Sequence, residues 1–129
     1  MSLNKNMRVV IVDDYSSMLR ILRNLLRQLE INNVEEANDG DTALQLMQRS
    51  PPDLIISDWN MAPVTGLDLL RNVRADAKLK HIPFIMVTAE SKTENVVTAK
   101  KAGVSNYIVK PFNADTLRAK IVSVFPAMV

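Results

Sequence analysis

The residues best suited to do chemistry are acids, a hydroxyl and a lysine that each follow a short apolar run of the chain. They are Asp13, Asp14, Asp58, Thr88 and Lys110. If the apolar runs are parallel strands of one sheet, their carboxyl ends share an edge, and ligands bind at that edge in open α/β folds. This combination of residue types predicts a Mg²⁺-dependent acceptor of phosphoryl groups.

Each residue type has a defined use in such a site. Mg²⁺ prefers oxygen ligands, and clustered carboxylates repel one another unless a cation lies between them. A carboxylate is also a possible nucleophile toward phosphorus, and the product is an aspartyl phosphate. Lys110 would supply a second cation and Thr88 a hydroxyl donor, and backbone N–H groups beside Asn60 and Ala89 could bind further oxygens.

Each of these features has a simpler explanation when taken alone. The pair Asp13-Asp14 could cap a helix, and Lys110-Pro111 could mark an ordinary turn. The hypothesis of a phosphoryl site depends on their occurring together, at matching strand ends and in this order.

Strand-like and helix-like patterns alternate five times along the chain. The runs that predict strands are 8–12, 34–37, 53–58, 84–87 and 107–109, with 34–37 the weakest and near an edge. Apolar residues at helical spacing predict helices over 18–29, 43–47, 67–73, 91–103 and 113–125. We expect Asn32-Asn33 to end the first helix and Gly103 to end the fourth, with capping boxes at Thr65–Asp68 and Ser91–Glu94. Strands that are apolar throughout predict a sheet covered on both faces, so the fold is a doubly wound (βα)₅ parallel sheet.

The bulk composition indicates one globular domain, which we expect to span residues 7–127. The chain has 129 residues, of which 47% are hydrophobic and 23% charged. Residues 1–6 are predicted to be a disordered start or a cloning remnant. There is no cysteine and no apolar stretch long enough for a membrane span, which fits a cytoplasmic protein.

The net charge of +2 is unevenly distributed. Residues 92–120 hold six basic residues against two acidic ones, so the rest of the chain is acidic. This pattern is compatible with an ordinary solvated helix face or with a docking surface for an acidic protein. No nucleic-acid-binding motif accompanies it.

Five segments of the chain resemble the receiver domains of two-component response regulators, in particular those of chemotaxis. The segments are Val12-Asp13-Asp14, Asn33-Val34-Glu35-Glu36-Ala37, Ile56-Ser57-Asp58-Trp59-Asn60-Met61, Met86-Val87-Thr88-Ala89-Glu90 and Val109-Lys110-Pro111-Phe112. Together they extend the resemblance over nearly the whole chain, from about Arg8 to Phe125. The resemblance implies the flavodoxin-like strand order 2-1-3-4-5.

The resemblance also implies a role for each site residue. Asp58 would accept phosphate from a histidine kinase. Mg²⁺ would be held by Asp14, Asp58 and the backbone carbonyl of Asn60, with Asp13 acting partly through water. Lys110 would contact the phosphoryl group, and the bond from Lys110 to Pro111 would be cis.

The remaining implied roles concern signal output and lifetime. Thr88 would move toward the phosphoryl group, with Ala89 beside it, and Tyr107 would change from an outward to an inward rotamer. Asn60 and Glu90 would tune dephosphorylation. The output surface would comprise the helix after Ser91, the strand at Tyr107 and the last helix. The partner would be the flagellar motor switch or another acidic protein. The protein itself would be a monomer, and it would act in signalling and not as a turnover enzyme.

The sequence departs from the family pattern in two respects. The loop Met61-Ala62-Pro63-Val64-Thr65-Gly66 replaces the usual Met-Pro-x-Met-Asp-Gly, and the basic output face leaves the partner open.

Two other functions have related sequence requirements. A Mg²⁺-dependent phosphatase would need a second aspartate where Asn60 stands. A phosphorelay intermediate, or a receiver domain cut from a larger regulator, would have the same sequence features. Trp59 is expected to be exposed beside Asp58.

Overall fold

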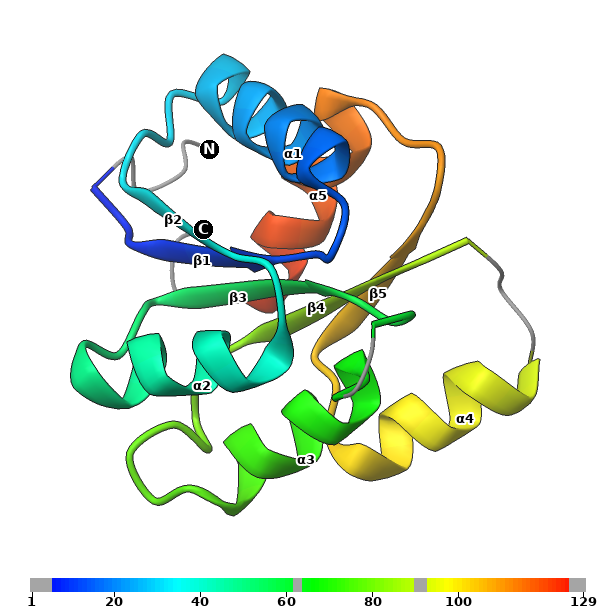
Figure 1. Cartoon of the computed structure of the whole chain (residues 1–129). Coiled ribbons are helices and arrows are strands. Elements are labelled where there is room, and N and C mark those ends of the chain that lie inside the picture. Colours follow the sequence, from blue (N-terminus) through cyan, green and yellow to red (C-terminus); the bar gives the residue numbers. More distant parts are fainter. Residues whose placement is uncertain (1–5, 62–63, 90–92, 126–129) are drawn as a thin grey trace.

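The computed structural model describes residues 6–61, 64–89 and 93–125 and shows five strands alternating with five helices (Figure 1). The strands are β1 (Val9–Val12), β2 (Val34–Ala37), β3 (Leu54–Asp58), β4 (Phe84–Thr88) and β5 (Asn106–Val109). The helices are α1 (Ser16–Gln28), α2 (Gly40–Arg49), α3 (Gly66–Ala75), α4 (Thr93–Ala102) and α5 (Ala114–Val124).

All strand pairs are parallel, and the sheet order is β2-β1-β3-β4-β5. Every residue of β1, β3 and β4 is buried, whereas β2 and β5 are partly exposed because they are the edge strands. The sequence prediction of a doubly wound parallel sheet, with a weak second strand at an edge, is therefore confirmed.

The helices cover both faces of the sheet. Figure 1 shows α1 and α5 on one face and α2, α3 and α4 on the other. Two apolar clusters fill the interfaces, one of them including Leu22, Ile56 and Leu117, the other Met47, Ile55 and Leu69. Side chains that alternate along β3 thus enter opposite clusters, which explains why Leu54, Ile55 and Ile56 are apolar in succession. Among the described residues, no helix is long and apolar enough to cross a membrane.

Helix capping agrees with the sequence at several ends. Thr65 and Asp68 form the expected capping box of α3, Asn113 caps α5 through Thr116 N, and Gly103 follows α4 with a φ of +97°. The capping box expected at Ser91–Glu94 falls partly outside the described residues.

The end of α1 differs from the prediction, because the helix stops at Gln28 rather than at Asn32-Asn33. Glu30 adopts the left-handed conformation with a φ of +64°. Glu30 N donates to Arg27 O and Ile31 N donates to Leu26 O, and these two bonds form a Schellman motif. Because glycine is the usual residue at this position, the glutamate gave no signal of a helix end.

The left-handed conformation of Glu30 should cost a measurable amount of stability. We expect Glu30→Gly to be more stable than Glu30→Ala by about 1 kcal/mol, since only glycine adopts positive φ without steric cost. Comparing two variants that both lack the Glu30 side chain isolates the backbone effect. Urea unfolding followed by circular dichroism measures the difference, and equal unfolding midpoints would contradict the prediction.

Candidate functional site

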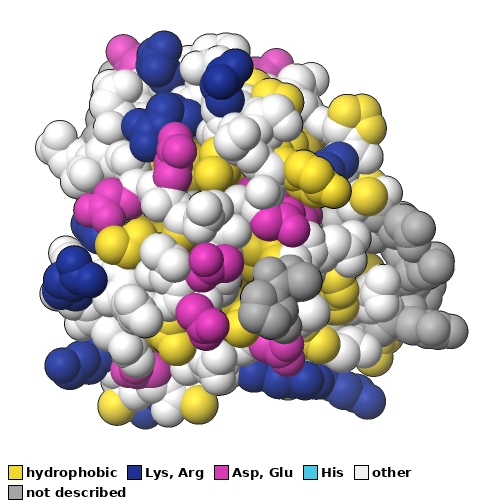
Figure 2. All heavy atoms as spheres, viewed as in Figure 1, with side chains coloured by type: hydrophobic (Ala, Val, Ile, Leu, Met, Phe, Trp, Pro, Cys, Tyr) yellow, Lys and Arg dark blue, Asp and Glu magenta, His cyan; other side chains and the backbone are white. Residues whose placement is uncertain are grey.

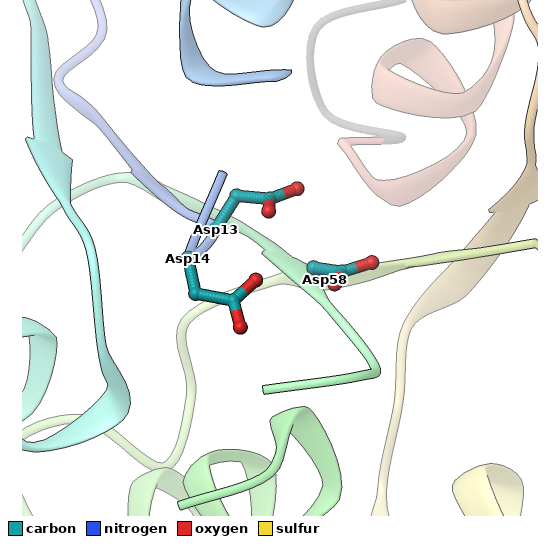
Figure 3. Close-up of side chains that lie close together, drawn as sticks. All are labelled: Asp13, Asp14 and Asp58. Carbon is teal, nitrogen blue, oxygen red and sulfur yellow. The ribbon is translucent and has the colours of Figure 1, made fainter. Parts of the chain in front are cut away.

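Three carboxylates meet at the carboxyl edge of the sheet (Figure 3). Asp13 and Asp14 directly follow β1, and Asp58 is the last residue of the adjacent strand β3. Val12 is paired with Ser57, so the register brings the next residue of each strand to the same level. One oxygen from each of the three carboxylates lies within 4.8 Å of the other two. Asp13 and Asp58 are buried and Asp14 is exposed, so the cluster opens to solvent on the Asp14 side.

Lys110 completes the group from the end of β5. Its Nζ lies 3.1 Å from Asp58 Oδ1 and 3.9 Å from Asp13 Oδ2. The Lys110 backbone N–H donates to Thr88 O at 2.8 Å, which fixes the start of the side chain beside the end of β4. The bond from Lys110 to Pro111 is cis. One cation therefore faces two buried acids.

Asp13 is the most strongly perturbed acid of the cluster. Its side chain is buried, and burial raises the pKa of its carboxyl to about 6, helped by the negative charges of Asp58 and Asp14. The Tyr15 N–H donates to Asp13 Oδ1 at 2.9 Å and, like Lys110, acts in the opposite direction on the pKa. Asp13 Oδ2 is buried without a hydrogen-bond partner among the described residues.

The pKa of Asp58 is also raised, mainly by burial and less by the charge of Asp14. A hydrogen bond from Lys110 and its positive charge oppose this effect. Asp58 is thus held in a low-dielectric position, with Lys110 as its cationic partner among the described residues.

The donor set fits a divalent cation such as Mg²⁺. All candidate ligands are oxygens, as Mg²⁺ prefers, and Asp13 Oδ2, which is 3.9 Å from Lys110 Nζ, is buried without a hydrogen bond from the described residues. The helix-capping explanation of Asp13-Asp14 is not supported, since the N-cap of α1 is Tyr15, which makes no side-chain capping bond.

The β3–α3 loop is fixed close to the cluster. Trp59 N donates to Val87 O, and Gly66 N donates to Trp59 O, both at 2.9 Å. Asn60, two residues after Asp58, is exposed, and Met61 is buried. Ala62 and Pro63, where the loop departs from the family pattern, lie outside the described residues.

Thr88 and Tyr107 lie together in a second part of the site, next to the end of β4. Thr88 is buried and Ala89 is exposed. A small cavity of about 10 Å³ is lined by Trp59, Met86, Thr88, Asn95, Val96, Ala99 and Tyr107. The residues from α4 in this lining were not among the predicted site residues, because spacing along the chain carries no signal for them. Glu90 lies outside the described residues.

The expected exposure of Trp59 is wrong. Its side chain is partly buried, packs against the core cluster on the α2–α4 face, and lines the cavity shared with Thr88 and Tyr107. The polar sequence on its C-terminal side suggested a solvent-exposed loop, but the hydrogen bond from Trp59 N to Val87 O holds the start of the loop on the sheet.

The parallel sheet of order 2-1-3-4-5, with acids at the ends of β1 and β3, defines a flavodoxin-like α/β protein with its site at the carboxyl edge. A sequence profile of the response regulator receiver domain matches residues 9–122. The chain therefore belongs to the response regulator receiver domain family.

Individual relatives of this chain within the family are chemotaxis proteins. The chemotaxis protein CheY-3 of Vibrio cholerae is 53% identical over 123 residues, which cover 95% of each chain. The chemotaxis protein CheY of Pseudomonas aeruginosa is 51% identical over 119 residues, covering 92% of this chain and 96% of that protein.

Solved structures agree with the sequence relatives. The structure of CheY4 from Vibrio cholerae superposes with a TM-score of 0.87 at 34% identity, covering 92% of this chain and 98% of that one. A putative response regulator from Chloroflexus aurantiacus gives a TM-score of 0.88 at 27% identity, and the match covers 94% of this chain and 98% of that one. Receiver domains of this type are signalling proteins rather than turnover enzymes.

Proposed function

We propose that this protein is a chemotaxis-type response regulator that is phosphorylated on Asp58 by a histidine kinase. The observation that carries the proposal is the position of Asp58, which is buried at the end of β3, 3.1 Å from Lys110 and beside Asp13 and Asp14. A carboxylate in such a place can act as a nucleophile while the neighbouring cation neutralises the charge of the group it receives.

In the proposed step, an Asp58 carboxylate oxygen attacks the phosphorus of a phosphohistidine. The bond from phosphorus to the histidine nitrogen breaks, an aspartyl phosphate forms, and the histidine keeps the electron pair of the broken bond. Lys110 would exchange its contact with Asp58 Oδ1 for one with a phosphoryl oxygen. Its tether at Thr88 O supports this role, because the base of the side chain stays fixed while the ammonium group shifts.

Asp13, Asp14 and Asp58 would hold Mg²⁺, together with the backbone carbonyl of Asn60. When bound, the ion would offset the negative charge of the carboxylates and the incoming phosphoryl group. Asn60 is exposed two residues after Asp58, which suits the proposed part in dephosphorylation that it would share with Glu90.

The proposed output is a change of affinity for a protein partner. Thr88 would move toward the phosphoryl group and Tyr107 would follow, with the Ala89 backbone N–H as a further phosphoryl contact. The small cavity that joins Thr88 and Tyr107 to α4 supports this connection. The output face would then consist of α4, β5 and α5.

The charge of this face favours an acidic partner, such as the flagellar motor switch. Figure 2 shows Lys and Arg side chains gathered at the lower right of the molecule, over α4, with acidic side chains in the middle of the same view. Lys100 and Lys101 are in the last turn of α4. We propose that residues 7–127 act as a monomeric cytoplasmic switch without nucleic-acid or membrane binding.

The experiment that tests this proposal uses Trp59, the single tryptophan of the chain, as a reporter. Because Trp59 lies next to Asp58 and lines the Thr88 cavity, we expect its fluorescence to change saturably with Mg²⁺. A second change should follow addition of acetyl phosphate. The variant Asp58→Asn should lack the second change, and mass spectrometry should find the added phosphoryl group in the wild type alone. A wild type that remains unmodified in Mg²⁺ and acetyl phosphate would refute the proposal.

A further inference from the structure

Lys120 of α5 lies over the ring of Tyr107, the residue proposed to move on phosphorylation. Its Nζ is 5.1 Å from the ring centroid, within the range of a cation–π interaction. The same Nζ is 3.4 Å from Asn106 Oδ1. The ammonium group is therefore held by two neighbouring residues of β5.

The Asn106 side chain organises this contact. Its Nδ2 donates to Ser123 Oγ at 2.8 Å, and its Oδ1 accepts from Tyr107 N at 2.8 Å. Ser123 Oγ in turn donates to Lys120 O at 2.6 Å. A closed set of hydrogen bonds thus connects β5 to the last turns of α5 and fixes the direction in which Lys120 can extend.

Lys120 reaches around the edge of the sheet. Asn106 bonds to α5, on the face that α5 shares with α1, whereas Tyr107 packs against the cluster on the opposite face. Since β5 is the edge strand, a side chain from α5 that contacts both Asn106 and the Tyr107 ring can pass along the outer side of β5. The ring is consequently bounded by the ammonium group and by the small cavity lined by Trp59 and Thr88.

We propose that Lys120 is a positioning residue that stabilises Tyr107 in its partly exposed position and opposes its movement toward Thr88. A ring that moves toward Thr88 leaves the ammonium group, so the attraction between cation and ring is lost. Lys120 would therefore set how far a given phosphorylation level shifts the output face. This inference rests on the proposed function, because it assumes that Tyr107 moves on phosphorylation.

The test follows the two tyrosine rings by NMR in protein with labelled tyrosine. The chain has two tyrosines, and Tyr15 is 66% exposed, so it serves as an internal reference. The variants are Lys120→Met, which keeps a long side chain without charge, and Lys120→Arg, which keeps a cation that can lie over a ring. In the wild type the Lys120 ε-methylene protons should show an upfield shift from the Tyr107 ring.

We expect Lys120→Met to move the Tyr107 ring signal toward its position in the phosphorylated protein. A cation–π contact of ordinary strength at a partly exposed site corresponds to a change of about two- to fivefold in the equilibrium between ring positions. Lys120→Arg should restore the wild-type signal, and Asn106→Ala, which frees the ammonium group, should give an intermediate shift. An unchanged far-ultraviolet circular dichroism spectrum would show that each variant retains the fold.

The outcomes separate the inference from the function on which it rests. Suppose that acetyl phosphate moves the Tyr107 signal of the wild type, but that Lys120→Met changes neither the Tyr107 signal of the unphosphorylated and phosphorylated protein nor the populations of the two ring positions. The positioning role is then overturned. The role is also overturned if Lys120→Arg behaves like Lys120→Met. If acetyl phosphate moves neither the Tyr107 signal nor the Trp59 fluorescence of the wild type, it is the proposed function that fails.

Discussion

Gly66→Ala should lower the free energy of unfolding by at least about 3 kcal/mol, because overpacking against rigid backbone costs more than overpacking against side chains. A Cβ atom at Gly66 would lie 2.1 Å from Asp58 O, 2.9 Å from Trp59 Cα and 2.9 Å from Met86 Sδ. The hydrogen bond from Gly66 N to Trp59 O holds the two segments at this close approach. The start of α3 and the end of β3 would therefore have to separate next to the proposed phosphoacceptor.

Gly40→Ala is a matched control, since Gly40 and Gly66 are each the first residue of a helix. A Cβ atom at Gly40 would meet Val64 Cγ1 at 2.7 Å and Val64 Cβ at 2.9 Å, which are side-chain atoms. Because Val64 Cβ is fixed to the backbone, Val64 has to shift as a whole, and we expect a loss of about 1–2 kcal/mol there, smaller than at Gly66, where the backbone of β3 itself is met. Urea unfolding of the two variants measures the difference. Equal losses at the two positions would show that the Gly66 backbone contact relaxes easily.

The parts of the fold that the sequence predicted are those set by local signals. The runs 9–12, 54–56 and 84–87 are apolar throughout, and this pattern is hard to produce except in strands covered on both faces. Thr65 and Asn113 are capping residues whose side chains act within three residues of themselves, so their roles could be predicted from sequence. The end of α1 was missed because a glutamate occupies the left-handed position.

The site was predictable to the level of which strand ends meet, but not to the level of its electrostatics. Parallel strands place Asp13, Asp14 and Asp58 at one edge whatever their side-chain directions. Which of the adjacent acids is buried depends on packing around the start of α1, and the sequence does not contain that information. The contact between Lys120 and Tyr107 was missed for the same reason, because it joins different elements across a sheet edge.

The burial of Asp13 leads to a prediction about stability in the absence of Mg²⁺. The folded pKa of about 6 lies above the value of about 3.9 expected for an unfolded aspartate. The folded state then binds the proton more tightly, so the contribution of Asp13 to stability is greatest below pH 4 and is lost as the pH rises to about 6. The full loss for Asp13 is about 3 kcal/mol above this window. The raised pKa of Asp58 acts in the same direction.

We therefore expect Asp13→Asn to raise the free energy of unfolding at pH 7.5 in EDTA by up to about 3 kcal/mol. The variant should also lose the part of the pH dependence between pH 4 and 6 that Asp13 contributes. Urea unfolding at pH 4.5 and 7.5, with EDTA or with Mg²⁺, provides the measurement. Saturating Mg²⁺ should stabilise the wild type more than the variant, because a ligand that binds the folded state alone stabilises it.

Asp76→Asn provides a control of opposite sign. Hydrogen bonds from Lys78 N and Gln48 Nε2 hold the pKa of the Asp76 carboxyl below its usual value. Its contribution to stability is therefore present at neutral pH and lost as the pH falls through the folded pKa, so Asp76→Asn should destabilise the protein at pH 7.5. A destabilising effect of Asp13→Asn in EDTA would show instead that Lys110 and the Tyr15 N–H compensate fully for the burial of the Asp13 charge. The cluster would then be stable as a set of anions, and the case for a cation at this edge would rest on the oxygen ligands alone.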